Sequence, residues 1–224
     1  RKASTSSALS PGTITNSGGA DAMLAVTGTS QYDGVITDGA TNKTALSKSA
    51  GGMLTLTGAS SYSGGTTIAG GTLQMNHADA VGTAGLIIGN GARLSLNHSG
   101  TTSNAIQLVG AAQTIHVGDL AAISVGFRTP TLTGDVTTDG SAGTLAIDSY
   151  GRQDGSHNLT FSGNTISLGG KSLVINGHAA GGNVDSIAEA NNEKTTFANV
   201  TFDTTGNVSV GRGSLQVQGD SNVT

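Results

Sequence analysis

The stretch GGMLTLTGASSYSGGTTIAGGTLQMN, residues 51–76, decides how this chain is expected to fold. It contains three short candidate strands, at residues 53–57, 66–69 and 72–75, separated by glycine-rich turns. In the first and last of these, an apolar side chain alternates with a polar one, and this period of two places one strand face in a core and the other in water. Each strand is too short to be stable alone, so the stretch is expected to stack on copies of itself.

Two recurrences supply those copies. The pattern Leu-x-Leu-Thr-Gly-x-x-x-Tyr-x-Gly at residues 54–64 also occurs at 24–34, with valine for the second leucine. The pattern Leu-x-Met-Asn-His at residues 73–77 returns at 94–98, with leucine for methionine. Repeats of roughly 20 to 50 residues indicate a solenoid, and strand-period units without a helical pattern favour a β-helix. We therefore predict an all-β fold, a right-handed parallel β-helix with glycine-rich turns and about ten coils of about 20 residues each.

The chain is expected to form one domain. Residues 1–20 are a polar N-terminal segment or partial cap, and residues 21–224 form the β-helix, which is most repeat-like over 22–97. Residues 183–194 contain Ser186-x-x-Glu189, which has the form of a helix capping box, although a protruding loop fits them equally well. The first residues lack the apolar core of a signal peptide, and the last are strand-like without a capping feature. We interpret the chain as a fragment of a longer protein or a processed product.

Composition narrows the class of protein. Only 11% of the 224 residues are charged and 3% are aromatic, while 36 are glycine and none is cysteine. Sparse charge argues against a disordered polyelectrolyte, and few aromatic residues argue against a compact globular core. A narrow core built from rows of aliphatic side chains is consistent with both the sparse charge and the few aromatic residues. The absence of cysteine excludes disulfides and cysteine-based metal or nucleophilic sites. A net charge of −4 without a Lys/Arg cluster makes nucleic acid an unfavourable partner.

The aligned repeats predict which residues stack. Leucine and methionine side chains at matching positions would form inner rows, and the asparagines that follow them would form an amide ladder along the stack. His77 and His98 could lie side by side as a metal site, but we favour two solvated histidines and predict no metal and no other cofactor. The predicted structural ladder comprises Leu54, Leu56, Leu73, Met75, Leu94, Leu96, Asn76 and Asn97.

Three segments together resemble a known repeat: Gly-Val-Ile at 34–36, Leu-Ser-Lys at 46–48, and GMLTLTGASSYSGGTTIAGGTL at 52–73. They are similar to the passenger-associated β-strand repeat of autotransporters, the Gram-negative type V secretion proteins. The resemblance covers about residues 33–75, with Ala50 where the family usually has glycine and Met53 where it usually has threonine. It implies a passenger domain that is exported through a C-terminal β-barrel missing from this sequence, and that is secreted or displayed on the cell surface. That barrel would be its only link to a membrane. Passengers of this family include adhesins, self-associating proteins and hydrolases.

Enzyme motifs are largely missing. The sequence Gly219-Asp220-Ser221 begins like a trypsin-type nucleophile loop but continues with asparagine, and no GxSxG, P-loop or HExxH motif is present. His116 and His178 show no complementary carboxylate spacing. Scattered acids could form a glycosidase-like cluster, but we interpret them as polar turn residues and predict that the chain is not an enzyme. They are Asp119, Asp135, Asp139, Asp148 and Asp154.

The loop at residues 149–157 (SYGRQDGSH) is the candidate ligand site. It combines an aromatic ring, a bidentate donor and a carboxylate, which a sugar-binding patch needs, although loops that bind nothing have the same composition. The candidate residues are Tyr150, Arg152, Gln153, Asp154 and His157.

The sequence thus favours a structural passenger at the bacterial surface that mediates adhesion or self-association. Its partner would be another copy of itself, or a glycan or protein of a host or biofilm surface. Two alternatives remain open. One is a glycan-active β-helix enzyme of the polysaccharide lyase or hydrolase kind, and the other is a passive stalk or folding segment of a larger passenger.

Overall fold

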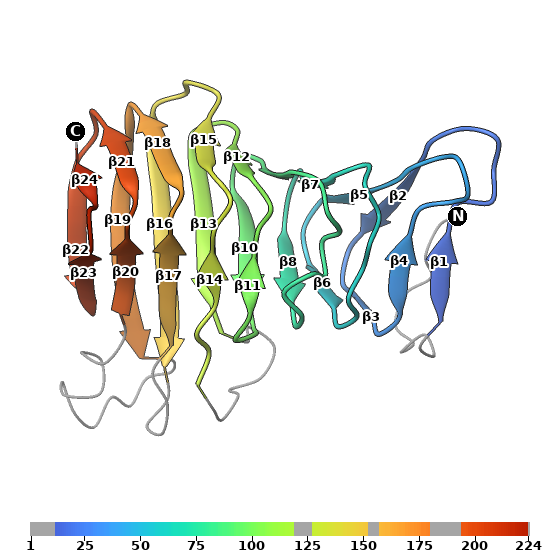
Figure 1. Ribbon diagram of the computed structural model, residues 1–224, viewed down its shortest axis with the longest axis horizontal. Helices are drawn as coiled ribbons and strands as arrows, with labels where there is room; N and C mark the ends of the chain where they lie inside the picture. The colour runs from blue at the N-terminus through green and yellow to red at the C-terminus, as the bar shows by residue number, and fades with distance from the viewer. Residues whose placement is uncertain (1–11, 119–126, 152–156, 180–193, 224) are drawn as a thin grey trace.

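The computed structural model describes residues 12–118, 127–151, 157–179 and 194–223. The described residues form 24 strands and no helix. Figure 1 shows the strands stacked side by side along the long axis, from β1 near the N-terminus to β24 near the C-terminus. Of the stretch at residues 183–194, expected to be a helix or a protruding loop, residues 183–193 lie outside the described residues and Lys194 begins β20.

Strands of successive coils pair in parallel, so the strand order within each sheet follows the chain. This arrangement, in stacked sheets that do not close into a barrel, confirms the predicted parallel β-helix. Sheet 1 contains β2 (Ala22–Thr27), β5 (Thr44–Ser49), β7 (Thr66–Ile68), β9 (Leu86–Ile88), β12 (Ile106–Leu108), β15 (Val136–Thr138), β18 (Thr165–Gly169), β21 (Thr201–Thr204) and β24 (Asn222–Val223).

Two further sheets complete the coils, and a strand pair lies at the N-terminal end. Sheet 2 contains β3 (Ser30–Tyr32), β6 (Met53–Leu56), β8 (Thr72–Met75), β10 (Ala92–Leu96), β13 (Ala112–Val117), β16 (Gly143–Gly151), β19 (Lys171–Ala179) and β22 (Val208–Arg212). Sheet 3 contains β11 (Thr101–Thr102), β14 (Thr131–Leu132), β17 (Asn158–Ser162), β20 (Lys194–Ala198) and β23 (Ser214–Gln218). The N-terminal pair is β1 (Thr13–Thr15) with β4 (Val35–Thr37).

Coil length changes along the stack. In sheet 1, Leu46 pairs with Thr66, which pairs with Leu86, so these coils have 20 residues. Further on, Ile106 pairs with Val136, so that coil has 30 residues. The coils lengthen after β12, since the coil that contains β11 of sheet 3 still has 20 residues. The expected coil of about 20 residues therefore holds for the early part. It holds again at the end, where Phe202 pairs with Val223, but not for the coils between them. The nine strands of sheet 1 come close to the ten coils expected.

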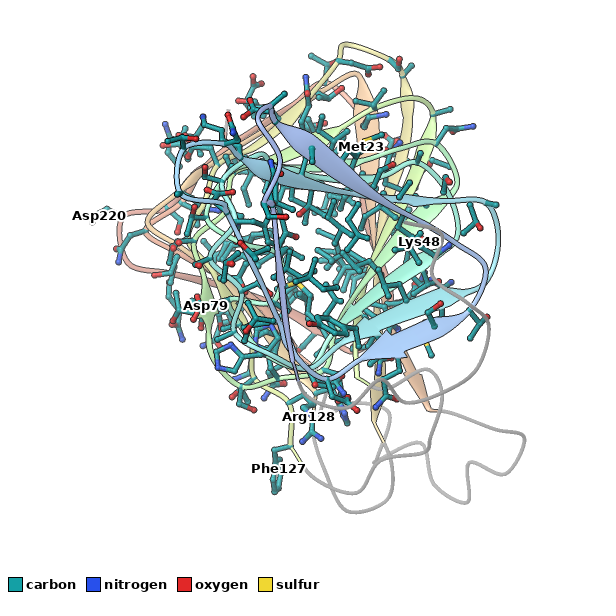
Figure 2. All side chains as sticks on the ribbon, turned by 90° about the vertical axis from the view of Figure 1, so that its right-hand side faces the viewer. Met23, Lys48, Asp79, Phe127, Arg128 and Asp220 are labelled. Carbon is teal, nitrogen blue, oxygen red and sulfur yellow. The ribbon has the colours of Figure 1, made fainter. Side chains whose placement is uncertain are left out.

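Aliphatic rows form the core. Leu73 of β8 pairs with Leu54 of β6 on one side and Leu94 of β10 on the other, and the three side chains are at most 3% exposed. Each such side chain contributes about 1.5–3 kcal/mol when it is fully buried. In sheet 3, the rings of Phe161 and Phe197 lie 5.3 Å apart between centroids, so the longer coils accommodate aromatic residues. Figure 2, viewed along the stack, shows side chains filling the interior.

The last coil continues the inner rows but leaves them open. Val208 and Val210 follow Leu173 and Ile175 in register, and they are 43% and 44% exposed. Val217 follows Phe197 and is 52% exposed. At the C-terminal end, inner positions are thus left open where no further coil follows, as expected for a solenoid.

Candidate functional site

Aspartates at the corners bind the backbone of neighbouring coils. Asp38 follows β4, and its carboxylate accepts the hydroxyl of Ser63 at 2.6 Å and the backbone N–H of Thr44 at 2.7 Å. It also accepts the N–H of Ser63 at 3.1 Å. The hydroxyl of Ser63 and these backbone amides hold the pKa of Asp38 below its ordinary value. Because Ser63 belongs to the next coil, this carboxylate joins two coils where the sheet hydrogen bonds stop.

The later acids are used in the same way. Asp135 accepts the N–H of Thr165 at 2.8 Å, one coil further along. Asp139 accepts the N–H groups of Ser141 and Gly110, each at 3.0 Å, and these bonds lower its pKa. These contacts agree with the interpretation of Asp135 and Asp139 as turn residues. Asp119 and Asp154 lie outside the described residues.

Asp148 is different, because it lies on the outer face of sheet 2. Register pairs it with His116 of β13 on one side and Asn176 of β19 on the other. The amide of Asn176 donates to its carboxylate at 3.2 Å, and Arg93 approaches it at 3.9 Å. Strand register therefore places Asp148 beside His116, a neighbour that sequence spacing did not show, while the carboxylate itself contacts Asn176 and Arg93. Coil length changes between β13 and β16, so sequence spacing could not reveal this pairing.

The outer row that contains His116 is polar and buried. Gln74, Ser95 and His116 occupy matching outward positions on β8, β10 and β13, yet each is at most 2% exposed. The hydroxyl of Ser95 donates to the carbonyl of Gly118 at 2.8 Å. Burial lowers the pKa of His116 to about 3, and Arg93 and His157 act in the same direction. Burial, Arg93 and His157 therefore favour the neutral form of His116.

The predicted asparagine positions are hydrogen bonded along the stack. The amide of Asn97 donates to Oδ1 of Asn76 at 3.0 Å, and Gln74 donates to the same oxygen at 3.2 Å. Arg128 extends this series by donating from Nε to Oδ1 of Asn97 at 2.7 Å. Met75 and Leu96, which precede the two asparagines, are fully buried. The amides thus connect successive coils outside the aliphatic core.

The two histidines beside these asparagines differ, and the prediction that both are solvated is wrong for one of them. The side chain of His77 is 46% exposed, but His98 is only 7% exposed. The hydroxyl of Thr102, in β11, contacts Nε2 of His98, and Arg128 of the following coil faces the same ring. The sequence did not place either residue there. Within the described residues, no group of three or more His, Cys, Asp or Glu side chains could hold a metal ion.

The candidate ligand patch is described only in part. The backbone of Tyr150 pairs with His178 at the end of β16. His157 forms an isolated bridge with Arg128 and is 2% exposed, so its side chain does not face solvent. Arg152, Gln153 and Asp154 lie outside the described residues. The ligand patch therefore remains a prediction, and His157 is not an exposed member of it.

The segment from β5 to β8 can be compared with known families of repeats. Residues 46–75 cover most of β5 and all of β6, β7 and β8, and they match the family described as passenger-associated-transport-repeat. The chain carries a passenger-associated-transport repeat. This match confirms the resemblance to autotransporter passengers within the stretch where it is most specific. No curated protein and no solved structure matches the chain.

Within the passenger-associated-transport repeat, Lys48 is an internal cation. It is fully buried, and its ammonium donates to the carbonyls of Ser49, Ala50 and Gly51 at 3.0–3.1 Å. The three donors of the ammonium match three backbone acceptors of the turn between β5 and β6. Burial lowers the pKa of Lys48. The side chain therefore holds the turn from inside the stack.

The same corner of the passenger-associated-transport repeat needs left-handed backbone. Ala50 has φ of 61° and Gly71, one coil later, has φ of 71°. A Cβ at Gly71 would lie 2.5 Å from the carbonyl oxygen of Ala50, so only glycine fits there. Ala50 is the position where the family usually has glycine, and its φ gives the reason for that preference.

The described residues give no sign of a membrane-spanning helix, since none of them forms a helix of the required length and apolar character.

Proposed function

We propose that this chain is a structural, non-enzymatic part of an exported passenger, and that it mediates self-association at the bacterial surface. The observation that carries the proposal is the passenger-associated-transport repeat at residues 46–75, which forms four consecutive strands of an uninterrupted parallel stack. A repeat of this family supports secretion or surface display. The parallel stack provides a long, regular side for contact with other molecules.

The use of the acids supports a structural role. A glycosidase needs two carboxyl groups about 5–9.5 Å apart and directed at one bond. Asp38, Asp135 and Asp139 instead accept backbone N–H groups at corners, and Asp148 contacts Arg93 and Asn176.

The outer face of sheet 1 is the surface we propose for contact between copies. One row of this face runs in register across six strands, and its side chains are partly or fully exposed. None of them is charged, so two identical faces can meet without opposing like charges. The row comprises Ala25, Ser47, Thr67, Ile87, Gln107 and Thr137.

The proposal is tested by displaying the chain on bacterial cells and measuring how fast the cells clump and settle. The double variant Thr67→Lys/Gln107→Lys places two charges on the outer face of sheet 1. The matched control, Ala59→Lys/Ala111→Lys, adds the same charge at exposed turn positions. We expect clumping by the unmodified chain and by the control, and loss of clumping with the double variant.

Two results would contradict the proposal. Equal clumping by both double variants would remove the outer face of sheet 1 as the contact. If cells that display the unmodified chain settle no faster than cells that carry the display scaffold alone, the self-association hypothesis is rejected. In that case, binding of the displayed chain to host cells or immobilised glycans would favour adhesion, and absence of binding would favour a passive stalk.

A further inference from the structure

The turn at residues 97–100, between β10 and β11, is organised by one neutral histidine. Nδ1 of His98 accepts the backbone N–H of Gly100 at 3.1 Å. A ring nitrogen that accepts a hydrogen bond carries no proton, so in the neutral ring the proton is on Nε2.

The second ring nitrogen fits this assignment. Nε2 of His98 lies 3.5 Å from the hydroxyl oxygen of Thr102, and that hydroxyl donates its own hydrogen to the carbonyl of Ala78 at 3.0 Å. The oxygen of Thr102 therefore presents lone pairs to Nε2–H. A second proton on Nδ1 would point at the N–H of Gly100, donor against donor.

The surroundings of His98 oppose a positive charge. The charged and titratable groups that face it are His77 and Asp79 from the preceding coil and Arg128 from the following one. Arg128 is held nearby by its bond to Asn97, whereas the carboxylate of Asp79 is largely in water. Burial is the main cause that lowers the pKa of His98 to about 4, with His77 and Arg128 adding to it and Asp79 opposing it.

The turn also fixes the first strand of sheet 3. The carbonyl of Gly100 accepts the N–H of Thr131 at 3.0 Å, at the start of β14. Thr102 is 1% exposed and pairs with Leu132. Opening of the turn would therefore release β11 from its place at the beginning of sheet 3.

We propose that His98 is an acid-operated switch: protonation of its imidazole breaks the bond to Gly100 and releases β11, while the aliphatic rows of the neighbouring coils stay closed. The preceding coil provides a natural comparison. Nδ1 of His77 accepts the N–H of Asp79 at 3.1 Å in the same manner. That ring is half exposed, and the Asp79 carboxylate lies 3.8 Å away, so water and a counter-charge can accommodate a proton.

Amide hydrogen exchange at pH 7 and pH 4.5, corrected for intrinsic rates, tests the switch. In the unmodified chain, protection of Gly100 and Thr102 should fall roughly 50-fold at the lower pH, the linkage expected for a site that binds a proton near 6.5 when open and near 4 when closed. The amides of β8 serve as the internal reference for the stack.

Two variants separate the switch from general acid sensitivity. In His98→Asn, the side-chain oxygen can accept the same bond from Gly100 without titrating, so protection should no longer depend on pH beyond the intrinsic correction. His77→Asn should behave like the unmodified chain. An NMR spectrum of the histidine ring nitrogens of the unmodified chain at pH 5.5 should show His98 as the neutral Nε2–H tautomer. This measurement does not depend on whether either variant folds well.

Four results would overturn the proposal. They are equal protection of Gly100 at both pH values, the same loss in His98→Asn as in the unmodified chain, β8 amides that are no better protected than Gly100 at pH 4.5, and a charged His98 ring at pH 5.5.

Discussion

Truncation of Leu73 tests whether the aliphatic rows seal one another. Leu73 is fully buried between Leu54 and Leu94, which are in register on either side. Leu73→Ala removes three buried carbon atoms and leaves a cavity that the flanking coils cannot close, because their strands are held at a spacing of about 4.8 Å by backbone hydrogen bonds. We expect a loss of about 3–4 kcal/mol in the free energy of unfolding.

The matched control is a truncation in the same kind of row at the end of the stack. Val210 continues the row of Ile175 but is 44% exposed. Val210→Ala removes two carbon atoms that are only partly out of water, so the expected loss is about 1 kcal/mol. Beyond the one extra carbon atom that leucine loses, the difference between the two variants measures the effect of having a coil on both sides.

The assay is urea unfolding followed by far-ultraviolet circular dichroism. Because repeat arrays can depart from two-state unfolding, hydrogen exchange of the β8 amides provides a second, local measurement. A loss below about 1 kcal/mol for Leu73→Ala, or a loss equal to that of Val210→Ala, would refute the sealed row.

Three further predictions concern the first corner and acid stability. Ala50→Gly should raise the free energy of unfolding by about 0.5–1 kcal/mol in urea titrations, because Ala50 has φ of 61°. An unchanged or lower midpoint would contradict this. Gly71→Ala should lower it by at least about 2 kcal/mol, because its Cβ would meet the carbonyl of Ala50; a wild-type midpoint would show that the corner is free to move. Burial lowers the pKa of His98 to about 4 and of His116 to about 3, so the unfolded chain binds more protons below pH 6.5. Stability should be complete above that pH and about 3–4 kcal/mol lower at pH 5, and a urea midpoint that stays constant from pH 7 to pH 5 would argue against it.

The core rows could be predicted from sequence because the alternation is contained within single strands. Leu54 and Leu73 each follow a glycine-rich turn at the same distance, so their register is visible before any coordinates. Strand period alone decides which side chains face inward. The coil length after β12 could not be predicted, because the corners vary in length without changing the pattern of the strands.

The polar outer features depend on neighbours in other coils. The charge of Arg128 acts on His98 from the following coil, where its bond to Asn97 holds it. Pairing of His116 with Asp148 depends on a coil longer than the preceding ones. Sequence distance does not encode these contacts, since a corner can add residues without moving the strands.

Lys171 limits how such a stack can be shortened or rearranged. Its buried ammonium donates to the carbonyl of Gly110, 61 residues earlier, and its strand β19 is separated from β13 by β16. At the intervening position Gly143 has φ of 143°, and a Cβ there would collide with the carbonyl of Ala111. Deleting the coil that contains β15 and β16 would leave this lysine too long for its acceptor. The three coils around Gly143 should therefore be moved or replaced together when coils of this chain are used in a designed β-helix.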